Sequence, residues 1–161
     1  MAGPGLAVLR LALAVVFAAH GAHILFGLWA APGLGAGGLQ NTAAQYSALG
    51  LHPEMLLAVL AGIIQFFGGI LLAFGVLTRW AAAALIGFLV IGIWKEHYRW
   101  GFFLNWLGTA GRGHGVEYSL VLMGALVCLT ITGGGDWSFD GRRANSAAKR
   151  MSGRARLRGK I

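Results

Sequence analysis

The chain has 161 residues, of which 57% are hydrophobic and only 11% are charged. A soluble domain rarely has that balance, so we expect one small integral membrane domain. The formal net charge of +8 is concentrated in residues 141–161, which hold eight basic and no acidic residues, whereas residues 1–140 are formally neutral. No aromatic platform accompanies this basic tail, which argues against nucleic acid as a partner.

The first predicted membrane span covers residues 6–28. Its apolar run is longer than the core of a signal peptide and no basic residue precedes it, so we expect a retained helix. Arg10 lies about one turn inside this helix, from where its long side chain can reach the interface. A glycine-rich loop without Lys or Arg follows, and the segment that ends at Gly50 is long enough for a short helix.

The second predicted span, residues 55–77, carries no formal charge and is long enough to cross a hydrocarbon layer of roughly 30 Å. Gln65 interrupts it near the middle and shares a helical face with the small residues Ala61, Gly69 and Ala73. This pattern predicts close packing on another helix. The Gln65 amide then either bonds across the helix contact or serves a functional site.

The third predicted span, residues 80–100, reaches the needed length only by continuing beyond Trp94 through charged residues, with an aromatic belt at its end. The fourth, residues 117–132, is stopped by three glycines. It contains the only cysteine, Cys128, which excludes an intrachain disulfide and a C-x-x-C redox motif. We expect this thiol to pack as a small hydrophobe.

These spans predict an all-α integral membrane four-helix bundle in residues 1–140, followed by a disordered basic tail in residues 141–161. By the positive-inside rule the tail and Arg79 place both termini in the cytoplasm. The tail is expected to act as a topology signal and a lipid tether. Small residues are expected to form packing seams, either within one bundle or between two chains of a homo-oligomer, at Gly21, Gly68, Gly69 and Gly124.

This topology predicts two groups of polar residues. On the cytoplasmic side, charges that pair to fix helix ends are expected at Arg10, Arg79, Asp136 and Asp140. On the outer side, imidazoles and carboxylates that could relay protons or hold a metal are His20, His23, His52, Glu96, His97 and Glu117. Interfacial histidines commonly bond only to backbone or headgroups, so we assign no metal site.

Several segments, in this order and spacing, resemble the DoxX family of bacterial and archaeal four-helix membrane proteins. They are FAAHGAHILFG at residues 17–27, ALGLHP at 48–53, GGILLAFGVLTR at 68–79, GFF at 101–103 after His97, VEYSLVL at 116–122 and GGGDWSFD at 133–140. The resemblance implies a multi-pass protein of the bacterial or archaeal cell membrane. Members of this family are linked to oxidoreductase complexes that protect against oxidative stress, and a related group to thiosulfate oxidation coupled to quinone.

Two positions depart from the family pattern. Ile24 stands where members carry Lys, and Gln65 stands where they carry Glu. A buried Lys and Glu are tolerable together and costly apart, so the loss of both charges is consistent with a former pair. We therefore expect positions 24 and 65 to face each other, and we carry over no charge-dependent chemistry to them.

These features favour a membrane subunit that anchors a redox or oxidative-stress complex and lines a quinone pocket with His20, Gln65, His97 and Glu117. No flavin, haem or nicotinamide motif is present, so electrons would come from a redox partner protein, and no catalytic residue is assigned. One alternative is a non-enzymatic assembly protein. Another is a small transporter, for which no inverted repeat or half-helix is visible.

Overall fold

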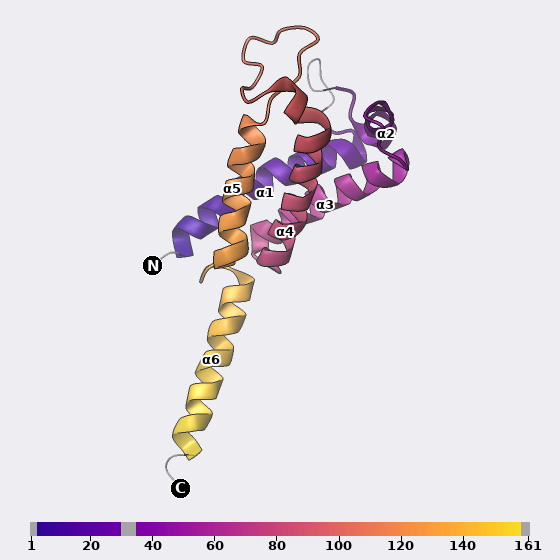
Figure 1. Ribbon diagram of the computed structural model, residues 1–161. Helices are drawn as coiled ribbons and strands as arrows, with labels where there is room; N and C mark the ends of the chain where they lie inside the picture. Colours follow the sequence, from indigo (N-terminus) through magenta and orange to yellow (C-terminus); the bar gives the residue numbers. More distant parts are fainter. Residues whose placement is uncertain (1–2, 30–34, 159–161) are drawn as a thin grey trace.

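The computed structural model describes residues 3–29 and 35–158, with side chains of the last helix described as far as Ser152. The glycine-rich loop expected after the first span lies partly outside the described residues. The described chain has helices and no strands, which confirms the predicted all-α class. In order it contains α1 (Gly3–Phe26), α2 (Gly38–Ala48), α3 (Glu54–Phe74), α4 (Thr78–Gly92), α5 (Glu117–Thr132) and α6 (Phe139–Arg158) (Figure 1).

Helix α4 continues without a break into a π-helical turn, η1 (Ile93–His97), and a 3₁₀ turn, η2 (Tyr98–Trp100). The continuous stretch Thr78–Trp100, α1 and α3 are each long and apolar enough to cross a membrane. α5 has the predicted bounds, but its 16 residues rise only about 24 Å, less than a hydrocarbon core of about 30 Å. Among the described residues, three helices therefore meet the length requirement, and α5 is a shorter apolar helix.

Helices α1 and α3 pack side by side in opposite directions, and glycines allow the close approach. A Cβ atom on Gly21 would overlap the backbone nitrogen of Phe66. Farther along, a Cβ on Gly69 would lie 2.6 Å from the backbone nitrogen of Ala18. Without side chains at these two positions, the backbones of α1 and α3 come into direct contact.

The other two predicted seam residues behave differently. A Cβ on Gly68 would lie 3.2 Å from Leu85, so Gly68 faces α4. Gly124 has nothing within 4 Å of its Cβ position, and Val121 on the same face of α5 is 68% exposed. The small-residue face of α5 is therefore turned outward. The core instead lies between the α1 and α3 pair and the α4 and α5 pair, and is built on Phe17, Leu72, Leu85, Leu89, Leu126 and Leu129.

The tail is not disordered over its described length, contrary to the prediction, because α6 extends to Arg158 and projects away from the other helices (Figure 1). Net charge alone favours disorder, but the segment is rich in Ala, Arg and Lys, which are strong helix formers. Asp140 in the first turn also complements the helix dipole. Residues 159–161 lie outside the described chain.

Candidate functional site

Arg10 is the centre of a buried polar cluster at the end of the molecule where α1 begins. Its side chain is only 2% exposed. Nη1 donates hydrogen bonds to the carbonyl oxygens of Leu72 at 3.1 Å and Ala73 at 3.3 Å, and Nη2 donates to that of Trp137 at 3.1 Å. The guanidinium thus supplies donors to the last turn of α3, whose carbonyls lack partners within the helix. It also ties this turn to the segment between α5 and α6.

Asp140 performs the complementary task at the start of α4. Its Oδ1 accepts the backbone N–H of Leu77 at 3.0 Å, and its Oδ2 accepts the N–H and the hydroxyl of Thr78 at 2.9 and 3.0 Å. The Asp140 N–H in turn donates to the carbonyl of Gly75 at 3.0 Å. A carboxylate at a helix N-terminus satisfies free N–H groups and complements the dipole.

The predicted pairing of four charges is therefore replaced by bonds from charges to backbone groups. Within the described residues no ion pair joins any of the four, because the helix ends that Arg10 and Asp140 reach need donors and acceptors of their own. Arg79 is exposed beside Gly133, and the exposed Asp136 accepts only a 3.4 Å bond from Asn145. The cluster is structural, since both terminal nitrogens of Arg10 and both carboxylate oxygens of Asp140 bond to groups at helix ends; among the described residues, Arg10 Nε is buried without a hydrogen-bond partner.

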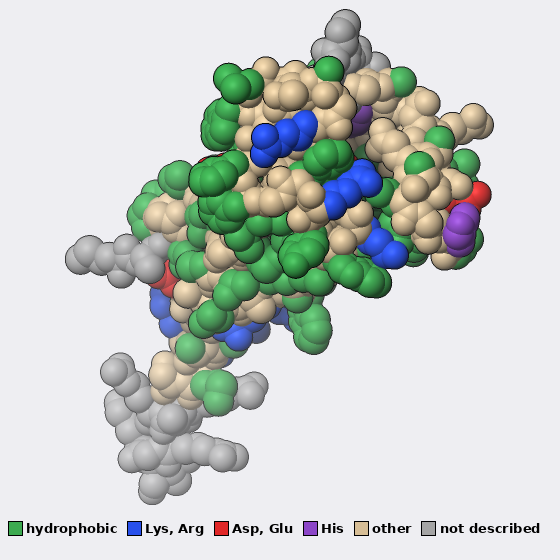
Figure 2. Space-filling view, turned by 45° about the horizontal axis from the view of Figure 1, so that its top comes forward, with side chains coloured by type: hydrophobic (Ala, Val, Ile, Leu, Met, Phe, Trp, Pro, Cys, Tyr) green, Lys and Arg blue, Asp and Glu red, His purple; other side chains and the backbone are tan. Residues whose placement is uncertain are grey.

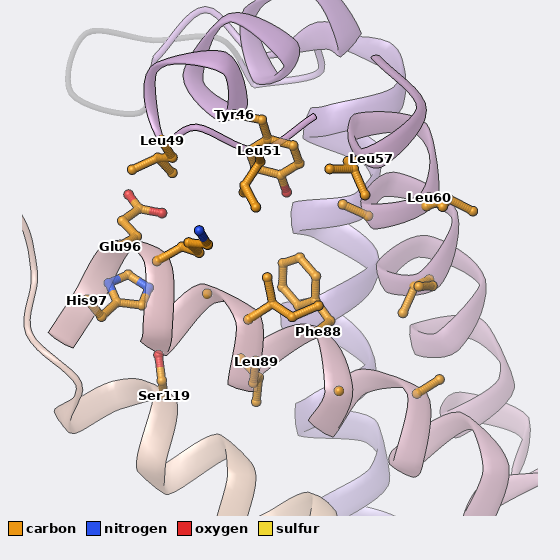
Figure 3. A pocket seen from close by; sticks show the side chains of 17 residues that line it. Tyr46, Leu49, Leu51, Leu57, Leu60, Phe88, Leu89, Glu96, His97 and Ser119 are labelled. Atoms are coloured by element: carbon orange, nitrogen blue, oxygen red, sulfur yellow. The ribbon is translucent and has the colours of Figure 1, made fainter. Parts of the chain in front are cut away.

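A cavity of about 410 Å³ lies toward the opposite end of the molecule, between α2, α3, α4 with η1, and the first turn of α5 (Figure 3). Most of its wall is apolar. Its lining includes Leu49, Leu51, Leu57, Leu60, Ala61, Ile64, Ala84, Gly87, Phe88, Leu89, Ile91 and Gly92.

The apolar part of the cavity opens toward the region that lipid would occupy. Leu60 on α3 and Ile91 on α4 line it and are 43% and 52% exposed. Between these helices, Ala84 and Gly87 leave a depression, and a Cβ on Gly87 would have no atom within 4 Å. From Ala84 to His97 the lining of α4 and η1 extends about 20 Å along the helix axis. A ligand with one apolar chain fits such a groove, and could enter it from the bilayer.

The polar groups gather at the other end of the cavity, where Tyr46, Lys95, Glu96, His97 and Ser119 line it. In Figure 3 Tyr46 enters from α2, whereas Glu96, His97 and Ser119 lie across the cavity from it. Three of these residues belong to the π-helical turn η1. A π turn changes the register of the side chains that follow, and such turns recur at functional sites.

Contacts and burial define the donor role of two of these polar groups. His97 Nδ1 lies 3.0 Å from the carbonyl oxygen of His114, which can only accept, so Nδ1 is the donor in this bond. Burial, and secondly the nearby Glu96 carboxylate, raise the pKa of the Tyr46 phenol above its ordinary value. Tyr46 therefore stays protonated and able to donate at neutral pH.

The loop between η2 and α5 contacts the polar end of this site at His97. Its two ends are joined by backbone hydrogen bonds from Val116 to Gly101 at 3.1 Å and from Glu117 to Phe102 at 2.9 Å. The Glu117 carboxylate accepts the N–H of Leu104 at 3.1 Å, so it holds the loop and does not line the cavity.

Of the four predicted pocket residues, the structure places only His97 in the cavity. His20 is exposed on α1 and does not line it. Gln65 is 4% exposed and its Nε2 donates a long bond of 3.4 Å to the carbonyl of Ala61 in its own helix, one turn from the cavity wall. Sequence reasoning missed Tyr46 and Ser119, since nothing in the local sequence marks either residue as part of a site.

The positions expected to face each other across α1 and α3 are 24 and 65. The methyl Cγ2 of Ile24 lies 3.0 Å from the Cβ position of Gly62, so position 24 faces α3 about one helical turn from Gln65. His52 pairs with its neighbour Glu54 at 3.0 Å. Across residues 3–29 and 35–158, no three His, Cys, Asp or Glu side chains come together in a way that could hold a metal ion.

Comparison with known proteins identifies the family of this chain. The family model DoxX matches residues 5–98, which is more than half of the chain and covers α1 to η1. No curated protein and no solved structure matches the chain. The matched region contains the three long apolar helices and most of the cavity wall. The chain belongs to the DoxX family and is a multi-pass integral membrane protein.

Proposed function

We propose that this protein is a membrane subunit that anchors a redox or oxidative-stress complex and binds a quinone in the cavity between α2, α3, α4 and α5. The observation that carries the proposal is the shape of that cavity. It combines a groove of apolar residues, open between Leu60 and Ile91, with polar groups at one end. A lipid quinone has the same division into a polar ring and an apolar chain.

The polar groups suit the two redox forms of the ring. The protonated Tyr46 phenol and the Ser119 hydroxyl can donate to quinone carbonyl oxygens, and His97 Nε2 can accept from a quinol hydroxyl. Reduction of the quinone takes up two electrons and two protons. The electrons would come from a redox partner protein, and Glu96 at the edge of the cavity is placed to pass protons from water.

The proposal includes an orientation. The basic residues of α6 and Arg79 lie at the end where α1 begins, so the positive-inside rule places both termini in the cytoplasm of a bacterial or archaeal cell. The cavity and η1 then lie at the outer face of the membrane. Quinone reduction there would take its protons from the outer side.

The test is retention of quinone by the purified protein. We would isolate the tagged chain from its native membranes in mild detergent and identify bound small molecules and proteins by mass spectrometry. Gly87→Leu fills the groove without meeting a neighbouring atom at its Cβ and should reduce bound quinone at least about tenfold, a loss of about 1.4 kcal/mol in binding.

Gly124→Leu is the matched control, because it adds the same side chain at an equally open position outside the cavity. It should leave quinone retention unchanged. Absence of quinone and of any redox protein from the wild-type preparation would contradict the proposal. Equal quinone in both variants would place the quinone elsewhere.

The outward face of α5 supports a second function, membrane assembly. Val121, Gly124 and Cys128 are exposed on this face, and small residues allow another helix to approach closely. If assembly is the function, Gly124→Leu should abolish copurification of partner proteins, or of a second copy of this chain. Gly87→Leu should not affect it, and quinone should be absent from both.

A further inference from the structure

Helix α6 has an exposed surface that the proposed function does not use. Its described side chains from Arg142 to Ser152 are all exposed. Within the described chain, the hydrogen bonds that tie α6 to the other helices or loops end at Asn145, whose amide contacts Asp136 at 3.4 Å. The remainder of the helix projects away from the transmembrane part (Figure 1), so packing does not set its angle to the membrane.

The charge on α6 has one sign and is unbalanced. Arg142, Arg143, Lys149 and Arg150 are exposed, and no acidic residue follows Asp140 in the chain. An isolated helix is of marginal stability in water, and a helix that carries only cations lacks the opposite charges three or four residues away that would stabilise it. An anionic surface would supply the opposite charge that α6 lacks.

The helix also has two faces. At 3.6 residues per turn, Ala144, Ala148 and Met151 fall on one side, and Met151 is 73% exposed. The four cations lie on the other side of the helix, roughly 100–150° around the axis from this strip at about 100° per residue. A face rich in Arg and Lys opposite an apolar strip is typical of helices that lie in a membrane interface.

Finally, α6 begins at a membrane surface. Trp137 and Phe139, which precede and start the helix, are 63% and 57% exposed, and aromatic side chains mark the interface of membrane proteins. Asp140 fixes this point to Leu77 and Thr78 at the turn between two membrane helices. In Figure 2 blue cationic side chains gather where the tail leaves the mainly green surface of the body.

We infer that α6 binds the anionic lipid surface of the leaflet from which it emerges, with the cations on the headgroups and the Ala144, Ala148 and Met151 strip toward the membrane. A second copy of α6 is a poor occupant because the two helices would repel each other. An anionic leaflet provides negative charge within the Debye length of the first two turns. The inference is independent of quinone binding.

The experiment places a reporter on α6 in the full-length chain. Cys128→Ser removes the native thiol, Met151→Cys introduces one, and the new thiol carries an environment-sensitive fluorophore. The protein is inserted into nanodiscs of phosphatidylcholine alone or mixed with phosphatidylglycerol, each with a headgroup-linked quencher. We expect a blue shift and about twofold stronger quenching in the anionic discs, both lost in about 1 M salt, where the Debye length is about 3 Å.

Neutralising Arg142, Arg143, Lys149 and Arg150 together to Gln should abolish the response to phosphatidylglycerol. The matched control neutralises Arg99 and Arg112, two exposed cations at the opposite end of the molecule. It should keep the response. Equal emission in the two kinds of disc would overturn the inference. So would a blue shift in neutral discs after RNA is added or after two chains are chemically crosslinked, because α6 would then bind RNA or a second copy of the chain. Thermal melting of each variant checks that the transmembrane part is intact.

Discussion

Asp140 accepts two hydrogen bonds from Thr78 through the same carboxylate oxygen, one from the backbone N–H at 2.9 Å and one from the hydroxyl at 3.0 Å. The two residues are 62 positions apart in the chain. Because Thr78 starts α4 and Asp140 lies in the first turn of α6, this contact attaches the beginning of the basic helix to the end of a membrane span. The cluster thus holds the start of α6 against the start of α4.

Replacing this carboxylate should loosen that attachment. In Asp140→Ala the N–H groups of Leu77 and Thr78 lose their acceptor, and we expect the free energy of unfolding to fall by about 1–2 kcal/mol. Asp140→Asn keeps one acceptor oxygen and should lose less. Thermal unfolding in detergent measures the difference. Asp136→Ala, at an exposed carboxylate, should melt like the wild type, and equal loss in both Ala variants would contradict a specific capping role.

Arg10 should be the more sensitive residue of the cluster. Arg10→Met keeps much of the side-chain length but removes the donors to Leu72, Ala73 and Trp137, which should cost about 2–4 kcal/mol. Arg10→Lys restores a donor but cannot reach all three carbonyl groups in the same way, so partial recovery is expected. Arg79→Met is the control at an exposed arginine. A stable Arg10→Met protein would show that the three bonds contribute little.

The contact between α1 and α3 predicts that an added methyl group lowers stability at Gly21 but not at Gly124. In Gly21→Ala the new Cβ would overlap the backbone of Phe66, so α1 and α3 must move apart, at a cost of about 1–3 kcal/mol. Gly124→Ala places its methyl in open space and should be neutral within about 0.5 kcal/mol. Melting curves of the two variants in the same detergent decide the matter. Similar stability of both would mean that the helices are less tightly packed at Gly21.

Tyr46 should titrate above its ordinary pKa of 10.0, because burial and the Glu96 carboxylate disfavour the phenolate. The difference in absorbance between wild type and Tyr46→Phe during an alkaline titration isolates this phenol from Tyr98 and Tyr118. Glu96→Gln should lower the pKa only partly, since burial is the larger cause. Arg99→Gln serves as the control, and a phenol that titrates at its ordinary value would contradict the burial of Tyr46.

The same shift has a consequence for stability. A raised pKa in the folded state means that folding favours the protonated phenol, so its contribution to stability is complete below the unfolded pKa of about 10. It is lost as the pH rises from there through the folded pKa. Tyr46→Phe should therefore flatten the decline in melting temperature above about pH 10. If the melting temperature of Tyr46→Phe falls as steeply as that of the wild type, other groups cause the loss of stability at alkaline pH.

The sequence predicts the class of this protein because hydropathy and length are local properties. Runs of apolar residues sufficient for a bilayer predict spans at residues 6–28, 55–77, 80–100 and 117–132, since backbone groups in lipid must bond within the segment. The structure has helices long enough to cross at the first three, Gly3–Phe26, Glu54–Phe74 and Thr78–Trp100, and a shorter apolar helix at the fourth. The ordered motifs around these helices predict the DoxX family, which the family comparison confirms. For the tail, the prediction of disorder from net charge was wrong, because the high helix propensity of its residues favours helix α6.

What only the tertiary structure decided is which polar groups meet. Arg10 and Asp140 were expected to pair with other charges, but the helix ends that they contact offer backbone carbonyls and N–H groups that must be satisfied. His20 lies on α1, which contributes no residue to the cavity wall, and Gln65 on α3 lies one turn from the wall residue Ala61. Tyr46 and Ser119, from two elements distant in the chain, line the cavity together. Periodicity determines that a helix forms. Its rotation and depth are decided by close contacts such as that of Gly21 with Phe66, which exist only once the helices have packed.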